Sequence, residues 1–219
     1  MMRYIIANWK MNMNLKDLEV WFDKFDKLIA RKGFDQKIVL APAFVHLPLV
    51  IKYAENYGLE VSTQDVSIYK KGAYTGDVGA FQIKDFCHYC IVGHSERNET
   101  TENVLKKVDL CLEDKVIPIV CFKNPKEACT FYKKETILVW EDPQNISKDG
   151  VYRAEDPTTI TFTIKEIRSS LPREAILLYG GSVNRKNVRA LSAIAELDGV
   201  LVGNASLNPE HFLEIINAF

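Results

Sequence analysis

Several polar residues of this 219-residue chain stand directly after short apolar runs, and their types suit proton transfer. Asn8 and Lys10 follow the first such run, His94 follows the fourth, and Glu141 follows the sixth. Lysine, asparagine and histidine side chains can stabilise negative charge on oxygen, while a carboxylate can remove a proton from carbon. Together these residues favour proton abstraction next to a carbonyl group.

Two glycine-containing turns later in the chain are suited to binding a phosphate. Gly180-Gly181-Ser182 follows the seventh apolar run, and Gly203-Asn204 follows the eighth. Glycine lets the backbone approach a ligand closely, and free backbone amides bind phosphate oxygens. The glycine pair could instead serve only a tight turn, but the following serine and the second turn favour a phosphate site. The sequence therefore predicts proton transfer on a phosphorylated carbonyl compound.

These residues are placed by eight predicted strands, each followed by a helical pattern. Most of the apolar runs are continuous in Ile, Val and Leu, which is typical of parallel strands buried on both faces. The predicted strands are 3–8, 37–41, 59–63, 89–92, 116–121, 137–140, 176–178 and 199–202. The predicted helices are 15–31, 44–57, 80–86, 98–113, 125–131, 157–170, 185–197 and 209–218, of which 80–86 and 125–131 are short.

This alternation predicts an α/β fold, a (β/α)8 barrel with shortened middle helices. No linker or change of composition interrupts it, so we expect residues 1–219 to form a single domain. A doubly wound open sheet is the alternative architecture. In a parallel barrel the residues just after the strands line the catalytic face, so the polar clusters are expected to meet on one rim.

Composition and charge exclude several classes of protein. The chain is 47% hydrophobic and 26% charged, which is typical of a globular protein rather than a disordered one. A net charge of −1 gives no overall positive field for nucleic acid or an anionic membrane. The apolar runs are too short for a signal peptide or a membrane span, so we expect a cytoplasmic protein without nucleic-acid or membrane partners.

The five cysteines indicate reduced thiols rather than a metal or redox site. Cys87 and Cys90 form the one CxxC spacing, and no second pair of ligands accompanies it. The four histidines are scattered, and no nucleotide-binding fingerprint occurs. We therefore expect no metal and no cofactor.

Five segments resemble the signatures of triosephosphate isomerase, and they occur in family order. They are Asn-Trp-Lys-Met-Asn (8–12), Gly-Ala-Tyr-Thr-Gly-Asp (72–77), Val-Gly-His-Ser-Glu-Arg (92–97), Tyr-Gly-Gly-Ser-Val (179–183) and Asp-Gly-Val-Leu-Val-Gly-Asn-Ala-Ser-Leu (198–207). They span nearly the whole chain. The His-Ser-Glu-Arg and Gly-Gly-Ser-Val blocks are highly specific.

The resemblance implies interconversion of dihydroxyacetone phosphate and D-glyceraldehyde 3-phosphate through an enediolate, without a cofactor. By resemblance, Glu141 moves the proton between carbons one and two, and neutral His94 polarises the carbonyl. Lys10 and Asn8 stabilise the enediolate, and Glu96 pairs with Lys10. The backbone amides of three residues are expected to hold the phosphate: Ser182, Gly203 and Asn204.

The resemblance also implies an oligomer. Loop 65–79 resembles the family's intersubunit loop, whose tip, near Thr75, enters the active site of a partner. At least a dimer is expected. The short region between His94 and Glu141 resembles compact family members, some of which are tetramers.

The segment 140–150 departs from the family's mobile lid. Relatives usually carry Tyr-Glu-Pro, and later an Ile-Gly-Thr-Gly tip. Aligned without gaps, Glu141 takes the base position, and Ser147 replaces the glycine that contacts the phosphate. An alternative register makes Asp142 the base, but aspartate is shorter and the geometry of a base is demanding. The stretch 121–124 (Cys-Phe-Lys-Asn) also lacks the usual Gly-Glu after its cysteine.

Two other functions remain open at this point. A non-catalytic relative that binds phosphorylated sugars would explain the altered lid, although the four catalytic side chains are retained. A barrel isomerase acting on a larger phosphosugar is disfavoured, because the loops after the strands are short.

Overall fold

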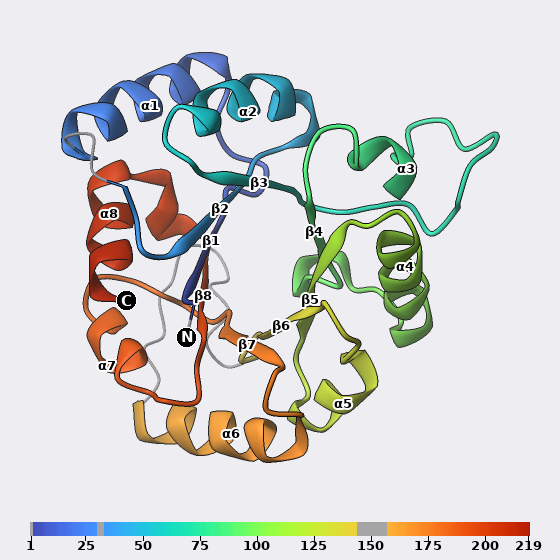
Figure 1. The fold of residues 1–219 in the computed structure, drawn as a ribbon, viewed down its shortest axis with the longest axis vertical. Helices are drawn as coiled ribbons and strands as arrows, with labels where there is room; N and C mark the ends of the chain where they lie inside the picture. Colours follow the sequence, from blue (N-terminus) through green and yellow to red (C-terminus); the bar gives the residue numbers. More distant parts are fainter. Residues whose placement is uncertain (1, 30–32, 144–156) are drawn as a thin grey trace.

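The computed structural model describes residues 2–29, 33–143 and 157–219, and within them eight parallel strands close into a barrel (Figure 1). Neighbouring strands pair in chain order, and β1 pairs with both β2 and β8, which closes the ring. The strands are β1 (Tyr4–Asn8), β2 (Lys37–Ala41), β3 (Glu60–Thr63), β4 (Tyr89–Val92), β5 (Ile117–Phe122), β6 (Ile137–Trp140), β7 (Ile176–Tyr179) and β8 (Gly199–Val202).

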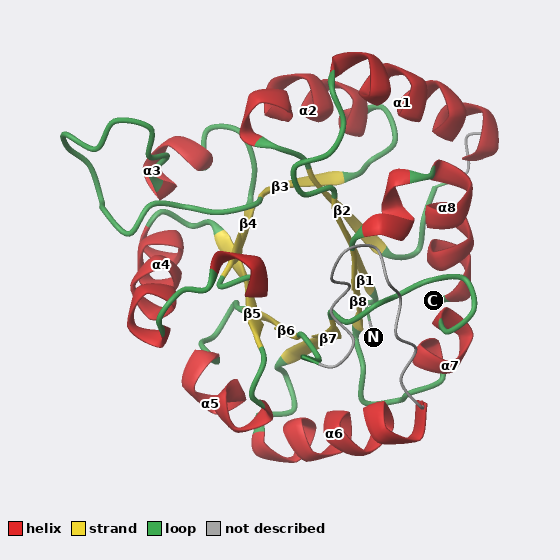
Figure 2. Cartoon of the chain, turned by 180° about the vertical axis from the view of Figure 1, so that it is seen from behind, coloured by secondary structure: helices red, strands yellow, loops and turns green. Residues whose placement is uncertain are grey.

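Helices surround this barrel on the outside (Figure 2). The α-helices are α1 (Leu15–Ile29), α2 (Leu47–Glu55), α3 (Ala80–Ile83), α4 (Thr101–Glu113), α5 (Ala128–Phe131), α6 (Pro157–Ser170), α7 (Val188–Ser192) and α8 (Pro209–Ala218). Four 3-10 turns accompany them in the described part of the chain: η1 (Phe44–His46), η2 (Ser95–Arg97), η3 (Pro125–Glu127) and η4 (Asn204–Leu207). Among the described residues, none of these helices is long and apolar enough to cross a membrane.

The predicted (β/α)8 barrel is confirmed, and the open sheet is wrong because β1 and β8 are paired. Every predicted strand forms, with ends that differ by at most one residue. The middle of the chain has short helices as predicted, since α3 and α5 have four residues each.

The helical predictions were less accurate. Residues 44–57 divide into η1 and α2, and α4 begins at Thr101 rather than at residue 98. The Thr100 hydroxyl accepts a hydrogen bond from the amide of Asn103, which caps α4 there. Of the predicted helix 185–197, only α7 forms. The predicted end of the first helix, residues 30–31, lies outside the described residues.

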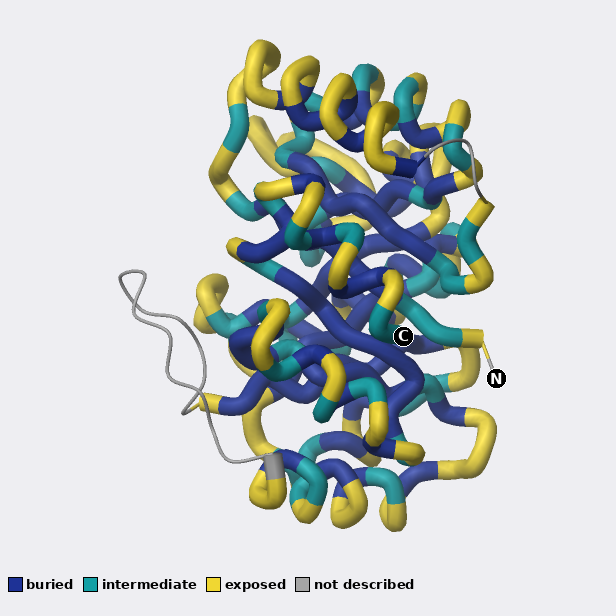
Figure 3. The backbone as a smooth tube through the Cα atoms, turned by 90° about the vertical axis from the view of Figure 1, so that its left-hand side faces the viewer, coloured by how far each residue is buried: buried dark blue, intermediate teal, exposed yellow. Residues whose placement is uncertain are grey.

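The core has two layers that follow from the alternation of side chains along the strands. One layer fills the barrel interior, with members such as Ile6, Ile91 and Val139. The other lies between the barrel and the helices, and it includes Trp21, Phe212 and Trp140. Figure 3 shows the buried positions running along the strands and the inner faces of the helices. This packing fixes the strand ends, and so fixes the rim on which the polar clusters stand.

Candidate active site

The residues predicted to do chemistry are brought together at the carboxyl ends of the strands. A cavity of about 280 Å³ is lined by Asn8, Lys10, His94 and Glu96, together with Gln64 and others. Asn8 ends β1, His94 follows β4 by two residues, and Glu141 directly follows β6. The carboxylate of Glu141 adjoins this group, because its Oε1 lies 3.2 Å from the Nε2 atom of His94.

Lys10 is held in a left-handed backbone conformation, with φ of +53°. Such a conformation is unfavourable for a residue with a side chain, and it persists only where the surroundings fix it. Here the Lys10 amide donates to Oδ1 of Asn8 at 3.1 Å, and Gln64 Nε2 donates to the Lys10 carbonyl at 2.9 Å. The ammonium group lies 2.6 Å from Oε1 of Glu96. The backbone and the charge of Lys10 are therefore both fixed by side chains of the site.

His94 is buried, and its hydrogen bonds define how it can act. Its Nδ1 atom accepts a hydrogen bond from the amide of Glu96 at 3.3 Å. We infer that Nδ1 carries no proton, so the proton of the neutral ring is on Nε2, next to Glu141. Burial lowers the pKa of His94, and Lys10 adds to this, although the carboxylates of Glu141 and Glu96 oppose it. The ring can thus donate a hydrogen bond from Nε2 while neutral.

The lowered pKa of His94 makes a prediction about stability. An unfolded histidine takes up a proton below its ordinary pKa of 6.5, whereas folded His94 does so only at lower pH. The unfolded state therefore binds more protons as the pH falls through this value, and His94 then favours unfolding. In denaturant titrations, we expect the free energy of unfolding to fall less with acidification in His94→Gln than in the unsubstituted protein. An equal fall in both would contradict the lowered pKa.

Glu141 is almost completely buried, with 2% of its surface exposed. Its carboxylate accepts hydrogen bonds from the Ser95 amide at 2.8 Å and from the Ser95 hydroxyl at 2.9 Å. A Cβ atom at Gly180 would lie 2.6 Å from Val139 and 3.2 Å from Cγ of Glu141, so this glycine leaves room for the carboxylate arm. Asp142 is also buried. The structure therefore brings Glu141 to His94 and Ser95.

Ser95 and Gln64 are site residues that cannot be picked out from the sequence alone. Ser95 stands inside the Gly-His-Ser-Glu-Arg segment, and this position next to His94 is the feature of the sequence that indicates a role in the site. Gln64 offered a weaker signal, since it only follows the third strand. Its amide donates both to the Lys10 carbonyl and to the Ala41 carbonyl at 2.8 Å, which links the loop after β1 to the end of β2.

The predicted phosphate-binding residues lie in the loops after β7 and β8. Gly203 adjoins Lys10, because a Cβ atom on Gly203 would lie 3.5 Å from Cε of that lysine. Asn204 is exposed and begins η4, and Ser182 is buried. Its carbonyl accepts a hydrogen bond from Asn187 Nδ2 at 2.7 Å. Ser147 lies outside the described residues.

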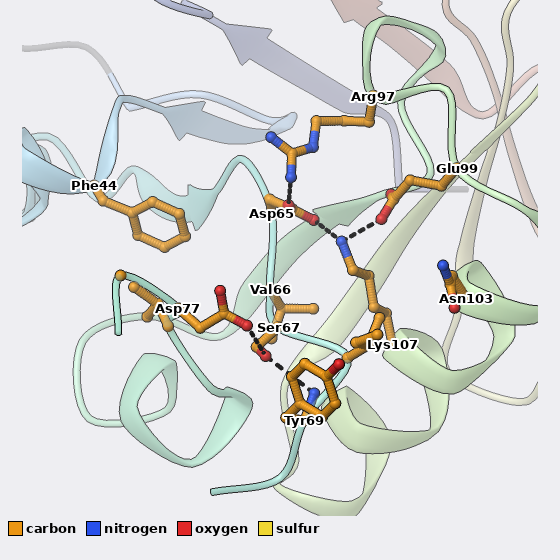
Figure 4. Close-up of a pocket in the computed structure, with 13 residues that line it drawn as sticks. Phe44, Asp65, Val66, Ser67, Tyr69, Asp77, Arg97, Glu99, Asn103 and Lys107 are labelled. Carbon is orange, nitrogen blue, oxygen red and sulfur yellow. Dashed lines mark hydrogen bonds and ion pairs between the residues drawn. The ribbon is translucent and has the colours of Figure 1, made fainter. Parts of the chain in front are cut away.

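A second cavity, of about 410 Å³, adjoins the first beside the base of loop 65–79 (Figure 4). The two cavities share Phe44, Asp65 and Arg97 in their walls. Asp65 forms ion pairs with Arg97 at 2.6 Å and with the buried Lys107 at 2.5 Å, and Lys107 also pairs with Glu99. This network connects the base of the loop to the His-Ser-Glu-Arg turn and to α4.

The cysteines form no disulfide in the part of the chain that the structure describes. Four are buried and Cys129 is exposed. Burial raises the pKa of Cys87 to about 11, which disfavours the reactive thiolate. Across residues 2–29, 33–143 and 157–219, no cluster of three or more His, Cys, Asp and Glu side chains is placed to hold a metal ion.

Known proteins resemble this chain over its whole length. The family model described as triosephosphate isomerase matches residues 3–219. The triosephosphate isomerase of Dictyoglomus turgidum is 32% identical, with 99% of each chain covered, and that of Aquifex aeolicus is 32% identical, with 100% of each covered. The triosephosphate isomerase of Thermus thermophilus is also 32% identical, over 99% of this chain and 98% of its own. This chain belongs to the triosephosphate isomerase family.

Proposed function

We propose that this protein interconverts dihydroxyacetone phosphate and D-glyceraldehyde 3-phosphate, with Glu141 as the base and His94 and Lys10 as the groups that stabilise the intermediate. The observation that carries the assignment is the contact of 3.2 Å between the Glu141 carboxylate and His94 Nε2, beside the cavity that Lys10 lines. A base and a hydrogen-bond donor side by side suit the transfer of a proton between adjacent carbons.

In the proposed reaction, the Glu141 carboxylate takes a proton from carbon one of dihydroxyacetone phosphate. The electrons of the broken C–H bond form a carbon–carbon double bond, and the carbonyl oxygen becomes negatively charged. The Nε2–H group of His94 and the ammonium group of Lys10 stabilise this oxygen. His94 donates its Nε2 proton to the oxygen on carbon two and takes the proton of the carbon-one hydroxyl, so that carbon one becomes the aldehyde and the ring ends neutral. Protonation of carbon two by Glu141 then gives D-glyceraldehyde 3-phosphate and restores the carboxylate. Asn8 and Glu96 keep Lys10 in place through the contacts described above.

The phosphate of the substrate is proposed to bind at the loops after β7 and β8. Glycine at position 203 leaves the backbone open beside Lys10, and Ser182 and Asn204 stand in the same pair of loops. Backbone amides in such loops are the usual phosphate site of (β/α)8 enzymes. Ser147, which lies outside the described residues, is proposed from the resemblance to contribute to the same phosphate site.

A test in deuterium oxide examines the reaction and its mechanism together. The purified protein is mixed with D-glyceraldehyde 3-phosphate, and the product is followed by proton NMR. Because a carboxylate that carries the proton exchanges it with solvent, we expect dihydroxyacetone phosphate with deuterium in at least part of its carbon-one positions. Absence of conversion would contradict the function, and conversion without any deuterium would contradict the base mechanism.

We further propose that residues 1–219 form one catalytic domain that acts in the cytoplasm, in glycolysis and gluconeogenesis. The pairing of β1 with β8 supports one domain, because both ends of the chain are needed to close the barrel. Free cysteines are typical of proteins in a reducing compartment, which supports the cytoplasm.

The substrate site is proposed to be completed by a second copy of this chain, in a dimer or a tetramer. Loop 65–79 extends away from the barrel beside α3 (Figures 1 and 2). It is internally ordered: the rings of Tyr69 and Tyr74 stack with centroids 3.7 Å apart, and the Ser67 hydroxyl donates to Asp77 at 2.6 Å. Thr75, which the resemblance puts near the tip, is exposed. Met11, 97% exposed, lines the substrate cavity and offers apolar surface for a partner loop.

The variant Thr75→Arg is expected to weaken this assembly, because a long charged side chain would enter the partner's cavity beside Lys10. Analytical ultracentrifugation is expected to show a shift toward monomer, with turnover reduced about 10²-fold as the site loses its partner loop. Thr159→Arg, on the exposed surface of α6, is the matched control and is expected to keep the parent assembly. An unchanged oligomer for Thr75→Arg would contradict the role of this loop.

A further inference from the structure

Trp140 is the last residue of β6 and directly precedes the proposed base. Side chains alternate along this strand, so Val139 belongs to the barrel interior while Trp140 belongs to the layer between barrel and helices. Glu141 follows in the alternation and reaches His94 on the inner side. The indole and the carboxylate thus leave adjacent residues on opposite sides of the barrel wall. Any rotation of the backbone at residue 140 would move the carboxylate.

The indole of Trp140 is fixed by one hydrogen bond and one ring contact. Its Nε1–H group donates to the Lys123 carbonyl, just beyond the end of β5, at 3.1 Å. On the other side, its ring packs against the ring of Tyr179 at the end of β7, with centroids 5.7 Å apart. Only 4% of Trp140 is exposed. The Trp140 side chain at the end of β6 therefore contacts residues at the ends of both neighbouring strands, β5 and β7.

The backbone at this point is hydrogen-bonded to both neighbouring strands. The amide of Glu141 donates to the Phe122 carbonyl, and the amide of Gly180 donates to the Trp140 carbonyl, both at 2.8 Å. Two residues further on, Pro143 has no N–H group, so it cannot add the next hydrogen bond of a parallel ladder. The hydrogen bond from the Trp140 indole to the Lys123 carbonyl lies beyond the last backbone hydrogen bond between β5 and β6, Glu141 to Phe122.

We propose that Trp140 is a positioning residue that holds the Glu141 carboxylate at the angle and distance needed for proton transfer. This inference rests on the proposed role of Glu141 as the base. The indole acts on the reaction through the backbone and does not touch the substrate. The base of an enzyme must be held to within a fraction of an ångström, so a small rotation of residue 140 is expected to reduce turnover.

The test is Trp140→Phe, which keeps an aromatic ring and removes the N–H donor. Tyr57→Phe is the control, since it likewise keeps an aromatic ring and removes one donor: the Tyr57 hydroxyl donates to Asp26 of α1 at 3.1 Å, in the outer layer of helices. The free energy of unfolding, kcat and KM are measured for both variants. The affinities for 2-phosphoglycolate, a carboxylate analogue of the enediolate, and for glycerol 3-phosphate are also measured.

For Trp140→Phe we expect kcat to fall about tenfold with KM changed less than about twofold, which indicates a lost transition-state interaction. The affinity for 2-phosphoglycolate should fall by a similar factor, while the affinity for glycerol 3-phosphate stays unchanged. Tyr57→Phe should lose free energy of unfolding with its hydrogen bond and keep kcat. This contrast separates positioning of the base from general loss of stability.

Parental kcat and parental 2-phosphoglycolate affinity in folded Trp140→Phe would overturn the positioning role. So would an equal loss of kcat in Tyr57→Phe. If the unsubstituted protein binds 2-phosphoglycolate but does not isomerise the triose phosphates, the proposed function fails instead. The analogue affinities of the parent and Trp140→Phe then still decide whether Trp140 orders the site.

Discussion

Glu141→Gln is expected to lower kcat about 10³-fold, the range found when a general base is removed. Glutamine has nearly the same shape, and its amide oxygen can still accept a hydrogen bond from Ser95, as the carboxylate does now. An amide cannot take the substrate proton, so the chemical step is lost while binding of the phosphate remains. Steady-state kinetics with D-glyceraldehyde 3-phosphate should therefore show a lower kcat with little change in KM.

Asp142→Asn is the matched control for this experiment. It also decides whether Glu141 or Asp142 takes the position of the base. Asp142 is buried next to the base, and the sequence alone allows it to take the same role. With Glu141 as the base, folded Asp142→Asn keeps most of its turnover. A large loss in Asp142→Asn, with turnover preserved in Glu141→Gln, would assign the proton transfer to Asp142.

Lys10→Met is expected to reduce kcat/KM by at least about 10³-fold, because the negative oxygen of the enediolate loses its cationic partner. Methionine keeps much of the length of lysine without the charge. The backbone at residue 10 is fixed by Asn8 and Gln64 through main-chain atoms, so the substitution should leave the fold and the strained turn intact. Circular dichroism and turnover of the purified variant test both statements.

The control for this lysine is Lys37→Met. Lys37 is exposed to a similar extent, 35% against 29% for Lys10, and it likewise pairs with a glutamate, Glu60, at 3.1 Å. It begins β2, whereas the active site lies beyond the other ends of the strands. Lys37→Met is therefore expected to keep the parental rate. Near-normal turnover in Lys10→Met would rule out the proposed role of that lysine.

The strands could be predicted closely because most are apolar runs flanked by polar residues or glycine, although Glu60–Thr63 is largely polar. Ile137–Trp140 and Gly199–Val202 show this, since their bounds follow directly from hydrophobicity. The last helices were harder. Ile194 and Leu197 are buried and suggested a longer helix, but they lie after the end of α7. The Asn187 side chain bonds the Ser182 carbonyl and the Asn184 amide, which shapes the turn before α7.

The residue types of the site could be predicted, but the contacts that position them could not. Lys10 and Gln64 are 54 residues apart, and Ser95 and Glu141 are 46 residues apart, so their hydrogen bonds depend on the closed barrel. The left-handed conformation of Lys10 is equally invisible in the sequence, because it is imposed by these distant partners. The same holds for Trp140, which reads as an ordinary apolar strand residue until its indole is seen to bond Lys123.

Turnover of the purified protein with D-glyceraldehyde 3-phosphate, in an assay coupled to a dehydrogenase that consumes dihydroxyacetone phosphate, tests the central claim most directly. If Glu141, His94 and Lys10 act as one proton-transfer site, the unsubstituted protein converts D-glyceraldehyde 3-phosphate efficiently and Glu141→Gln does not. A folded protein that binds 2-phosphoglycolate but produces no dihydroxyacetone phosphate would contradict the account, and would identify a sugar-phosphate binder that has kept the site without its chemistry.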